Sequence, residues 1–330
     1  MGAIWLIVIG IVIFFIAYIT YGAWLAKEWG IDPPRETPAN TKYDGIDYCP
    51  AKKPVLLGHH FSSIAGAGPI LGPIGASIFG WLPVALWIIV GSIFFGGVHD
   101  FGSLIASVRH DGKSIGEIIE INIGKTGKRL FALFAWLTLI LVIAAFLNTT
   151  ANAFISTPSA GTSSILFIFL AMIFGFAIYR KNMNLVVCTV IGVGLLIFCI
   201  YLGQIFPLEL SLKSWILLLI VYIFLASILP VWLLLQPRDY LNSFLLYAMI
   251  AGAVIGIVIF NPVLEMAPYT GFNVGGQWLF PMLFVTVACG AISGFHSLVG
   301  SGTTSKQLNN EKDARLVGYG SMLIEGILAL

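Results

Sequence analysis

Residues 58–73 read GHHFSSIAGAGPILGP, and residues 289–308 read CGAISGFHSLVGSGTTSKQL. Both segments lie in a strongly apolar chain, yet they carry histidines, hydroxyls and repeated Gly or Pro. At membrane depth every backbone polar group needs a partner, so an interrupted helix is tolerated only where protein or a wet cavity surrounds it. We therefore predict two broken membrane helices, a feature that usually marks a binding site near the bilayer midplane.

The composition indicates a membrane protein. Of the 330 residues, 58% are hydrophobic and 10% are charged, whereas soluble domains average about 25% charged residues. About ten apolar runs have the roughly 17–25 residues that a membrane helix needs. They start near Ala3, Val55, Trp81, Leu130, Ser164, Leu185, Trp215, Leu241, Trp278 and Leu316. We predict an all-α, polytopic helical membrane protein with one transmembrane domain over residues 1–330.

The basic residues give an independent check on the number of spans. Basic residues concentrate in cytoplasmic loops and should therefore alternate between connections. Of the 17 Lys and Arg residues, all except Lys213 fall in odd-numbered connections. The odd connections are therefore predicted to be cytoplasmic, with the N-terminus outside. Because the basic residues follow sidedness and form no single patch, we predict the lipid bilayer, and no nucleic acid, as a partner.

Two cytoplasmic segments are distinctive. Residues 29–54 are rich in Pro, Asp and Lys and are predicted to form a loop. In the connection 109–129, Ser114 and Glu117 match a capping box that opens a short helix along the membrane face. The first apolar run lacks a cleavage site and is predicted to be a retained span. The four cysteines show neither a disulfide framework nor zinc spacing, and no cofactor is predicted.

The first predicted break combines Gly and Pro with two histidines. Gly66 and Gly68 permit close backbone approach, and Pro69 leaves carbonyls of the preceding turn without helical donors. Such carbonyls suit a sodium ion or a proton-linked water, while the N-terminus of a half-helix suits a carboxylate. His59 and His60 lie in the polar run before the break. The alternative is that the small residues only allow tight helix packing.

His99 and Asp100 interrupt the third apolar run, within the motif GGVHDF. A carboxylate at the centre of a membrane helix costs about 2.5–3.5 kcal/mol on insertion scales and is a functional-site hypothesis by default. Histidine titrates near physiological pH and suits a proton relay. Adjacent helical residues point about 100° apart, so the two cannot face one cavity equally. The alternative is a structural pair that caps a neighbouring helix end.

The second predicted break is rich in hydroxyls, which could bind an alkali cation or donate to a carboxylate. Its alternative is a cytoplasmic Gly/Ser turn, especially beyond Ser305. Arg238 and Asp239, in the motif QPRDYLN that closes the seventh predicted span, form either an inner gate or a solvated helix end. Glu325, in the last apolar run, is a carboxylate that we leave outside the candidate site.

Three groups of site residues follow. The substrate- or ion-binding candidates are Gly66, Ala67, Gly68, Ser293, Ser297, Ser301 and Thr303. The proton-coupling candidates are His59, His60, His99, Asp100 and His296. The gate candidates are Arg238 and Asp239. The sequence contains no H-E-x-x-H, G-x-S-x-G or P-loop pattern, so neither an enzyme nor a metal site is predicted. A membrane metalloenzyme using the histidines and Asp100, or a nutrient sensor, are the alternatives.

Six motifs resemble the carbon starvation protein A (CstA) family of bacterial and archaeal inner-membrane transporters. They are DGIDYCP (Asp44–Pro50), GHHFSSIAGAGP (Gly58–Pro69), GGVHDF (Gly96–Phe101), QPRDYLN (Gln236–Asn242), CGAISGFHSLVGSGTTSKQL (Cys289–Leu308) and GYGSML (Gly318–Leu323). Together they span nearly the whole chain, and the long motifs are specific.

The resemblance implies a function. Members of the family take up peptides or pyruvate, in symport with protons, when carbon is short. It therefore implies a secondary active transporter in the cytoplasmic membrane that imports a small carboxylate-bearing nutrient. The coupling ion would be a proton or sodium.

The resemblance also implies an inverted-repeat fold of the LeuT/APC type. If the second span opens one repeat, the seventh opens the other, with internal breaks at Pro69 and Pro230. Ser293 and Ser297 would then face the carbonyls near residues 65–67. Since family members extend further at the C-terminal end, the chain is expected to be C-terminally incomplete, without the last helix of its second repeat.

Overall fold

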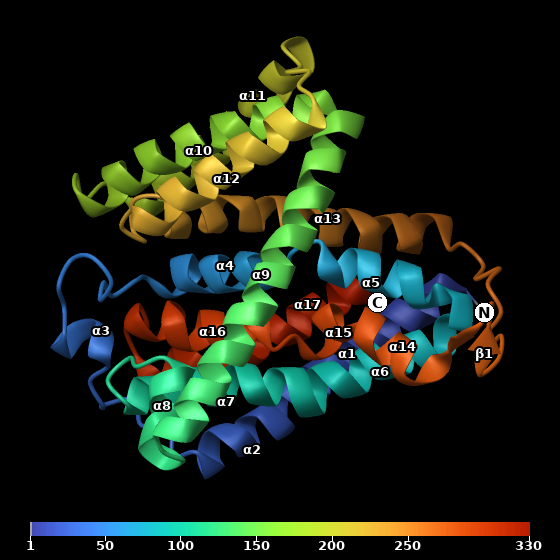
Figure 1. Ribbon diagram of the computed structural model, residues 1–330, viewed down its shortest axis with the longest axis horizontal. Coiled ribbons are helices and arrows are strands. Elements are labelled where there is room, and N and C mark those ends of the chain that lie inside the picture. Colours follow the sequence, from blue (N-terminus) through green and yellow to red (C-terminus); the bar gives the residue numbers. More distant parts are fainter. Residues whose placement is uncertain (1) are drawn as a thin grey trace. The chain divides into compact units, whose positions relative to one another are not determined.

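The computed structural model describes residues 2–330 and is almost wholly helical (Figure 1). Its contacts divide the chain into two compact units. Unit 1 comprises residues 2–115 and 243–330, and unit 2 comprises residues 116–242. The prediction of an all-α polytopic membrane protein is confirmed. The single domain and the inverted repeat stay predictions.

Unit 1 contains the elements from both ends of the chain. Its N-terminal elements are α1 (Ala3–Ile19), α2 (Tyr21–Glu28), α3 (Pro38–Thr41), α4 (Lys53–Ile64), α5 (Gly68–Ala76), η1 (Ser77–Phe79), α6 (Trp81–Gly91), η2 (Ser92–Gly96) and α7 (Gly97–Arg109). Its C-terminal elements are β1 (Asn273–Val274), β2 (Gln277–Trp278), α14 (Leu279–Thr286), α15 (Ala288–Ile292), α16 (Phe295–Gly302), η3 (Thr304–Lys306), η4 (Glu311–Asp313), η5 (Arg315–Gly320) and α17 (Ser321–Ala329). η2 and η5 are π-helical turns that lead directly into α7 and α17.

Unit 2 is a group of long helices. They are α8 (Ile115–Asn122), α9 (Lys125–Ser156), α10 (Pro158–Tyr179), α11 (Leu185–Ile205), α12 (Leu212–Ile228) and the start of α13 (Leu235–Phe260). α10 packs along α11 (Figure 1). Individual residues determine where these helices begin. Pro158 is the first residue of α10 and separates it from α9. The side chains of Asn184 and Ser211 cap α11 and α12 by accepting hydrogen bonds from backbone N–H groups. The short helix that the capping box predicted is α8.

Seven helical segments within residues 2–330 are long and apolar enough to cross a membrane. They are Ala3–Glu28, Lys53–Phe79, Trp81–Arg109, Lys125–Ser156, Pro158–Tyr179, Leu185–Ile205 and Leu235–Phe260. α12 is apolar but has 17 residues. The ninth and tenth predicted spans correspond to the short helices α14–α16 and to η5 with α17. The count of about ten spans therefore stays a prediction.

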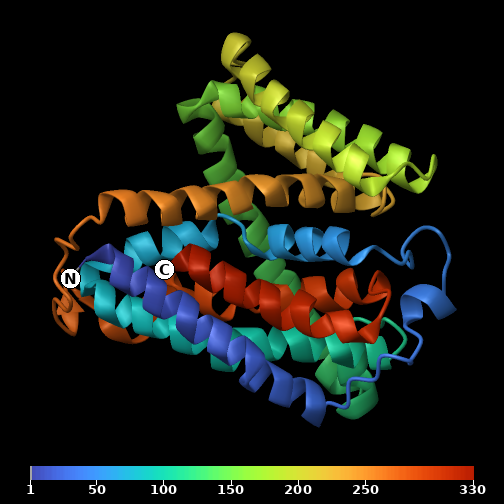
Figure 2. The ribbon, with the colours of Figure 1, turned by 180° about the vertical axis from the view of Figure 1, so that it is seen from behind.

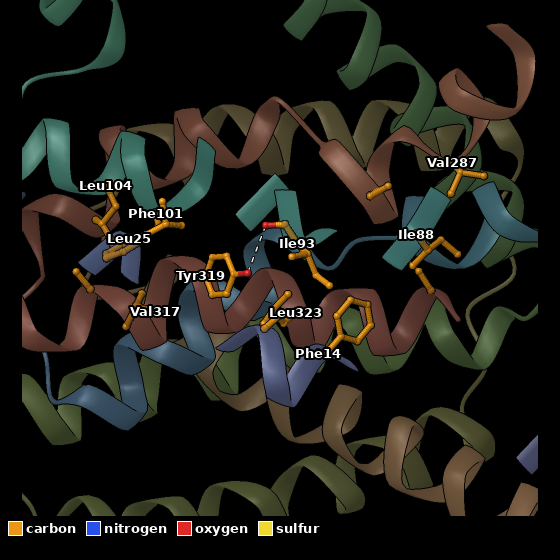
Figure 3. Close-up of a cluster of buried hydrophobic side chains, with 14 of the residues drawn as sticks. Phe14, Leu25, Ile88, Ile93, Phe101, Leu104, Val287, Val317, Tyr319 and Leu323 are labelled. Atoms are coloured by element: carbon orange, nitrogen blue, oxygen red, sulfur yellow. Dashed lines mark hydrogen bonds between the residues drawn. The ribbon is translucent and has the colours of Figure 1, made fainter. Parts of the chain in front are cut away.

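The apolar core of unit 1 brings α1, α7, η5 and α17 together (Figure 3). Tyr319 of η5 is buried there, and its hydroxyl donates a hydrogen bond to the Ile93 carbonyl at 3.3 Å. A Cβ at Gly97 would lie 2.6 Å from the Tyr319 ring, and one at Gly318 would lie 2.8 Å from the Phe101 Cα. Glycine at these two positions lets α7 lie directly against η5. Figure 2 shows α1 running beside α17.

Three of the basic connections meet at one end of unit 1. Ala51 forms a β-bridge with Leu308, and Lys53 pairs with Asp313 at 3.2 Å. At the opposite end, Gly2 forms a bridge with Val263. Arg109, at the start of the third connection, pairs with Glu311 of the ninth, so the first, third and ninth connections share one end of the unit. Which side of the membrane that end faces stays a prediction.

Glu311 organises the end where the basic connections meet. Its carboxylate is fully buried and accepts bonds from Arg109 Nε and Nη2 at 2.7 and 3.1 Å and from the Asp32 backbone N–H at 2.6 Å. Arg35 lies 3.6 Å away. Burial acts to raise the pKa of Glu311, but the bonds from Arg109 and Asp32 outweigh it and hold the pKa below its usual value.

We expect Glu311→Gln to lower the unfolding free energy by about 1.5–3 kcal/mol, the range for hydrogen bonds to charged groups. A depressed pKa contributes stability that is complete above the unfolded-state pKa and is lost as pH falls through the folded-state pKa. The wild-type protein should therefore lose stability on acidification below about pH 4.5, and the variant should lose less. Thermal unfolding in detergent across pH measures both effects.

The matched control is Glu36→Gln, an exposed glutamate in the same predicted cytoplasmic loop as Asp32 and Arg35. It should unfold like the wild-type protein at every pH. Equal stability of the Glu311 variant and the wild type at neutral pH would contradict the structural role of this carboxylate.

Candidate functional site

The first predicted break is present between α4 and α5. α4 ends at Ile64, Ala65 has a non-helical ψ of 65°, and α5 begins at Gly68. Pro69 falls in the first turn of α5, where its missing N–H costs nothing. His59 and His60 are both fully buried on α4, just before the break.

The second predicted break is also present, between α15 and α16. Ser293 has a non-helical ψ of 111°, and Gly294 precedes α16. α15 packs on α5: a Cβ at Gly68 would overlap Cys289 Sγ and lie 2.5 Å from its Cβ. The start of α5 therefore lies against α15, the helix that leads into the second break.

The placement of Ser293 and Ser297 against the carbonyls near residues 65–67 stays a prediction. The side chain that lies against Gly68 is Cys289, one turn before Ser293. Ser297 hydrogen-bonds with His99 Nδ1 at 3.2 Å. The short helix α15 (Ala288–Ile292) determines which side chains of this segment face α5. The hydropathy pattern does not show which face of α15 that is.

Four ionisable side chains form a continuous line, which we call the imidazole–carboxyl cluster. His99 Nδ1 lies 2.6 Å from Asp100 Oδ1, and Asp100 Oδ2 lies 2.9 Å from His296 Nδ1. On the other side of His296, Nε2 lies 3.4 Å from Glu325 Oε2. Asp100, His296 and Glu325 are fully buried, whereas the His99 side chain is 30% exposed. The unequal exposure of His99 and Asp100 agrees with their 100° separation on α7.

The cluster joins three helices that are far apart in the sequence. α7 supplies His99 and Asp100, α16 supplies His296, and α17 supplies Glu325. α7 packs on α16 and on η5, the turn before α17. Imidazoles and carboxyls in alternation can each accept or donate a proton, so the cluster is chemically suited to hold and transfer protons.

A second buried polar group surrounds His60. Its Nδ1 hydrogen-bonds with Thr304 Oγ1 at 2.8 Å. Nearby, Ser107 Oγ bonds with the Ser305 hydroxyl at 2.8 Å and donates to the Ser301 carbonyl at 3.0 Å. The Ser301 hydroxyl donates to the Ser297 carbonyl of its own helix. Thr303, at the C-terminal end of α16, is half-buried.

The gate candidates Arg238 and Asp239 lie in unit 2. Arg238 Nε and Nη2 bond to Asp239 Oδ1 at 2.8 and 2.6 Å, and Nη1 lies 2.5 Å from the Tyr222 hydroxyl. The motif QPRDYLN was expected to close the seventh span, but it begins α13. α12 ends at Ile228 because Leu229, which precedes Pro230, is extended. Pro230 therefore lies between two helices and does not break one.

Sequence reasoning left Glu325 outside the candidate site and did not single out Thr304 or Glu311. Glu325 carried a signal, since a carboxylate inside an apolar run is expensive, but its partner His296 is remote in sequence. Thr304 and Glu311 carried none, because both sit in polar segments next to a predicted turn. Within the described residues 2–330, no three His, Cys, Asp or Glu side chains are placed to hold a metal ion.

The fold and site define a multi-pass helical membrane protein in which two broken helices pack together beside a buried imidazole–carboxyl cluster. The sequence model of the carbon starvation protein CstA family matches residues 2–330, and the chain belongs to this family.

The curated relatives carry transporter names. Over its whole length, the chain is 38% identical to the pyruvate/proton symporter BtsT of Escherichia coli K12 and 40% identical to the peptide transporter CstA of the same organism. It is 41% identical to the peptide transporter CstA of Helicobacter pylori 26695. These names describe transporters and not enzymes.

The chain spans about half the length of these relatives: 48%, 49% and 50% respectively. No solved structure matches the chain.

Proposed function

We propose that the protein is a secondary active transporter that imports a small carboxylate-bearing nutrient, a short peptide or pyruvate, in symport with protons. The names of the relatives, a pyruvate/proton symporter and peptide transporters, support this substrate class. The family name supports a role in the carbon starvation response. The proposed location is the cytoplasmic membrane, with the N-terminus outside, because the basic connections follow the positive-inside rule.

The observation that carries the proposal is the imidazole–carboxyl cluster beside the broken helices. Three fully buried ionisable groups, Asp100, His296 and Glu325, would be costly in a membrane protein without a functional use. Imidazole and carboxyl groups exchange protons directly, which favours the proton over sodium as the coupling ion. His59 and His60 lie on α4, which packs on α16 and α17, and they are proposed as further proton-coupling residues.

The proposed substrate site is the junction of the two breaks. Gly66, Ala67 and Gly68 form the connection between α4 and α5, and the N-terminus of α5 suits a carboxylate. Ser293 and Ser297 lie at the matching break of the ninth predicted span. A carboxylate bound here would lie beside the cluster, because Ser297 contacts His99.

The Arg238–Asp239 pair is the proposed gate. Arg238 on α13 also bonds to Tyr222 on α12, so breaking this contact would free the two helices from each other. The Ser301 and Thr303 hydroxyls, on the cytoplasmic half of the predicted ninth span, are proposed to line the exit.

Uptake into proteoliposomes tests the function. Labelled pyruvate and a labelled dipeptide are supplied with a pH gradient or a sodium gradient imposed separately. We expect the pH gradient to drive accumulation of one substrate and the sodium gradient to drive none. Accumulation driven by sodium alone would contradict proton coupling. If folded protein binds a substrate but accumulates neither under any gradient, the sensor alternative replaces the transporter.

A further inference from the structure

Glu325 is the most unusual polar group in unit 1. It is fully buried, and neither carboxyl oxygen has a hydrogen-bond partner within the described part of the chain. The polar contact that the structure shows for it is His296 Nε2, 3.4 Å from Oε2. At that distance the two groups form an ion-pair contact and not a well-directed hydrogen bond.

The state of His296 determines where a proton must lie. Its Nδ1 faces the Asp100 carboxylate at 2.9 Å, so Nδ1 carries a hydrogen and donates it. If the ring is neutral, Nε2 presents a lone pair and Glu325 must be protonated to face it. If the ring is an imidazolium, Nε2 is the donor and Glu325 is a carboxylate. In both states the pair carries one proton, either on His296 Nε2 or on a Glu325 oxygen.

Removing that proton leaves a lone pair against a buried carboxylate. This state gains one negative charge inside the protein and is costly at low dielectric. The His296–Glu325 pair is therefore expected to bind one proton, because that proton removes the extra negative charge. We propose that Glu325 and His296 together bind the proton that is transported with the substrate, an inference that rests on the proposed function.

A route to this pair is present within the cluster. His99 is the partly exposed member, and its Nδ1 contacts Asp100, which in turn contacts His296. A proton entering at His99 would first protonate Asp100. His296 can then carry its hydrogen on Nε2 and accept from Asp100 at Nδ1, so that transfer of the Asp100 proton to Nδ1 releases the Nε2 hydrogen to Glu325. Each transfer moves one proton between neighbouring atoms and needs no other reactant.

The pair is also connected to the broken helix. Ala329 lies one helical turn after Glu325 and on the same face of α17. A Cβ at Gly290 would lie 2.8 Å from the Ala329 Cβ and 3.3 Å from the Pro69 Cα. The face of α17 that carries Glu325 therefore packs on α15 and, through it, on α5. A change of charge at Glu325 therefore falls on a helix face that packs against the proposed substrate site.

Other titratable groups lie on the elements packed against α17. They are Tyr18 on α1, Lys53, His59 and His60 on α4, His99, Asp100 and Arg109 on α7, Cys289 on α15, and Arg315 and Tyr319 on η5. Asp100 is the second carboxyl near the pair, and it already contacts His99 and His296. Glu325 is therefore the carboxyl that we assign to share the proton with His296.

The test compares Glu325→Gln with the exposed control Glu265→Gln in proteoliposomes. Gln keeps the size of the side chain but cannot bind the proton. We expect accumulation driven by a pH gradient to fall at least about tenfold in Glu325→Gln, within the usual range of coupling between sites. Exchange of labelled for unlabelled substrate at equal pH should persist. The control should behave as wild type, and Glu325→Asp should recover part of the accumulation.

Infrared spectroscopy provides a readout that does not depend on transport. Between about pH 6 and pH 9, exposed carboxyls stay ionised, so a pH-dependent carboxyl or carboxylate band reports a buried group. We expect such a band in the wild type and the control and its loss in Glu325→Gln. A band that persists in Glu325→Gln, or accumulation by this variant at the wild-type level, would overturn the proposal. Failure of the wild type to accumulate substrate, with the band lost in the variant, would overturn the proposed function alone.

Discussion

Asp100→Asn is expected to reduce accumulation driven by a pH gradient to background and to lower the unfolding free energy by about 3–5 kcal/mol, the cost of breaking a buried charged pair. Asp100 contacts two imidazoles, His99 at 2.6 Å and His296 at 2.9 Å. An asparagine oxygen can accept from one of them, while its amide N–H groups would face the other. The imidazole–carboxyl cluster then lacks a group that can accept a proton between His99 and His296.

The measurement is proteoliposome uptake combined with thermal unfolding in detergent. Asp111→Asn is the matched control, because Asp111 is exposed just beyond the end of α7. Its φ of 61° is a conformation that Asn adopts readily. The control should retain uptake and stability. Folded Asp100→Asn protein with wild-type accumulation would eliminate Asp100 from the proton route.

Gly68→Ala is the second substitution with a large expected effect. A Cβ at this position would overlap Cys289 Sγ and lie 2.5 Å from the Cys289 Cβ, so α5 must move away from α15. Overpacking of this kind costs about 1–3 kcal/mol. Because the junction of the breaks is the proposed substrate site, a displacement of about 1 Å should lower the uptake rate by about 100-fold.

A compensating substitution tests whether the clash is the cause. Cys289→Gly removes both atoms that the new methyl group meets, so the double variant Gly68→Ala, Cys289→Gly should recover stability and uptake relative to Gly68→Ala. Gly256→Ala is the control, since a Cβ there meets nothing within 4 Å and alanine favours a helix interior. Full activity of Gly68→Ala alone would show that the close approach of α5 and α15 is dispensable.

Much of the local structure could be predicted from the residues. Pro69 lacks the N–H that a continuing helix needs, Gly66 and Gly68 are unfavourable in a helix interior, and the structure breaks there. Ser114 and Glu117 predicted the start of α8. The Pro230 prediction was wrong in detail, because the proline ended α12 together with the extended residue before it, and the following motif began a new helix.

The candidate site was predicted in part. His99, Asp100 and His296 were selected as polar residues at membrane depth, and the structure brings all three together. Which of them touch, and that Glu325 completes the line, could not be predicted. Asp100 and His296 are 196 positions apart, and no local pattern links positions at that separation.

The amino-acid order alone settled the membrane class, the helical content, the positions of both breaks and the family motifs. These follow from hydropathy, from proline and glycine backbone chemistry and from residue identity, all of which act over a few neighbouring positions. The pairing of His296 with Glu325, the approach of Cys289 to Gly68 and the burial of Glu311 were decided by tertiary structure. Each depends on how distant helices pack, and that packing is set by close-fitting residues such as Gly97 and Gly318, whose partners are known only once the chain has folded.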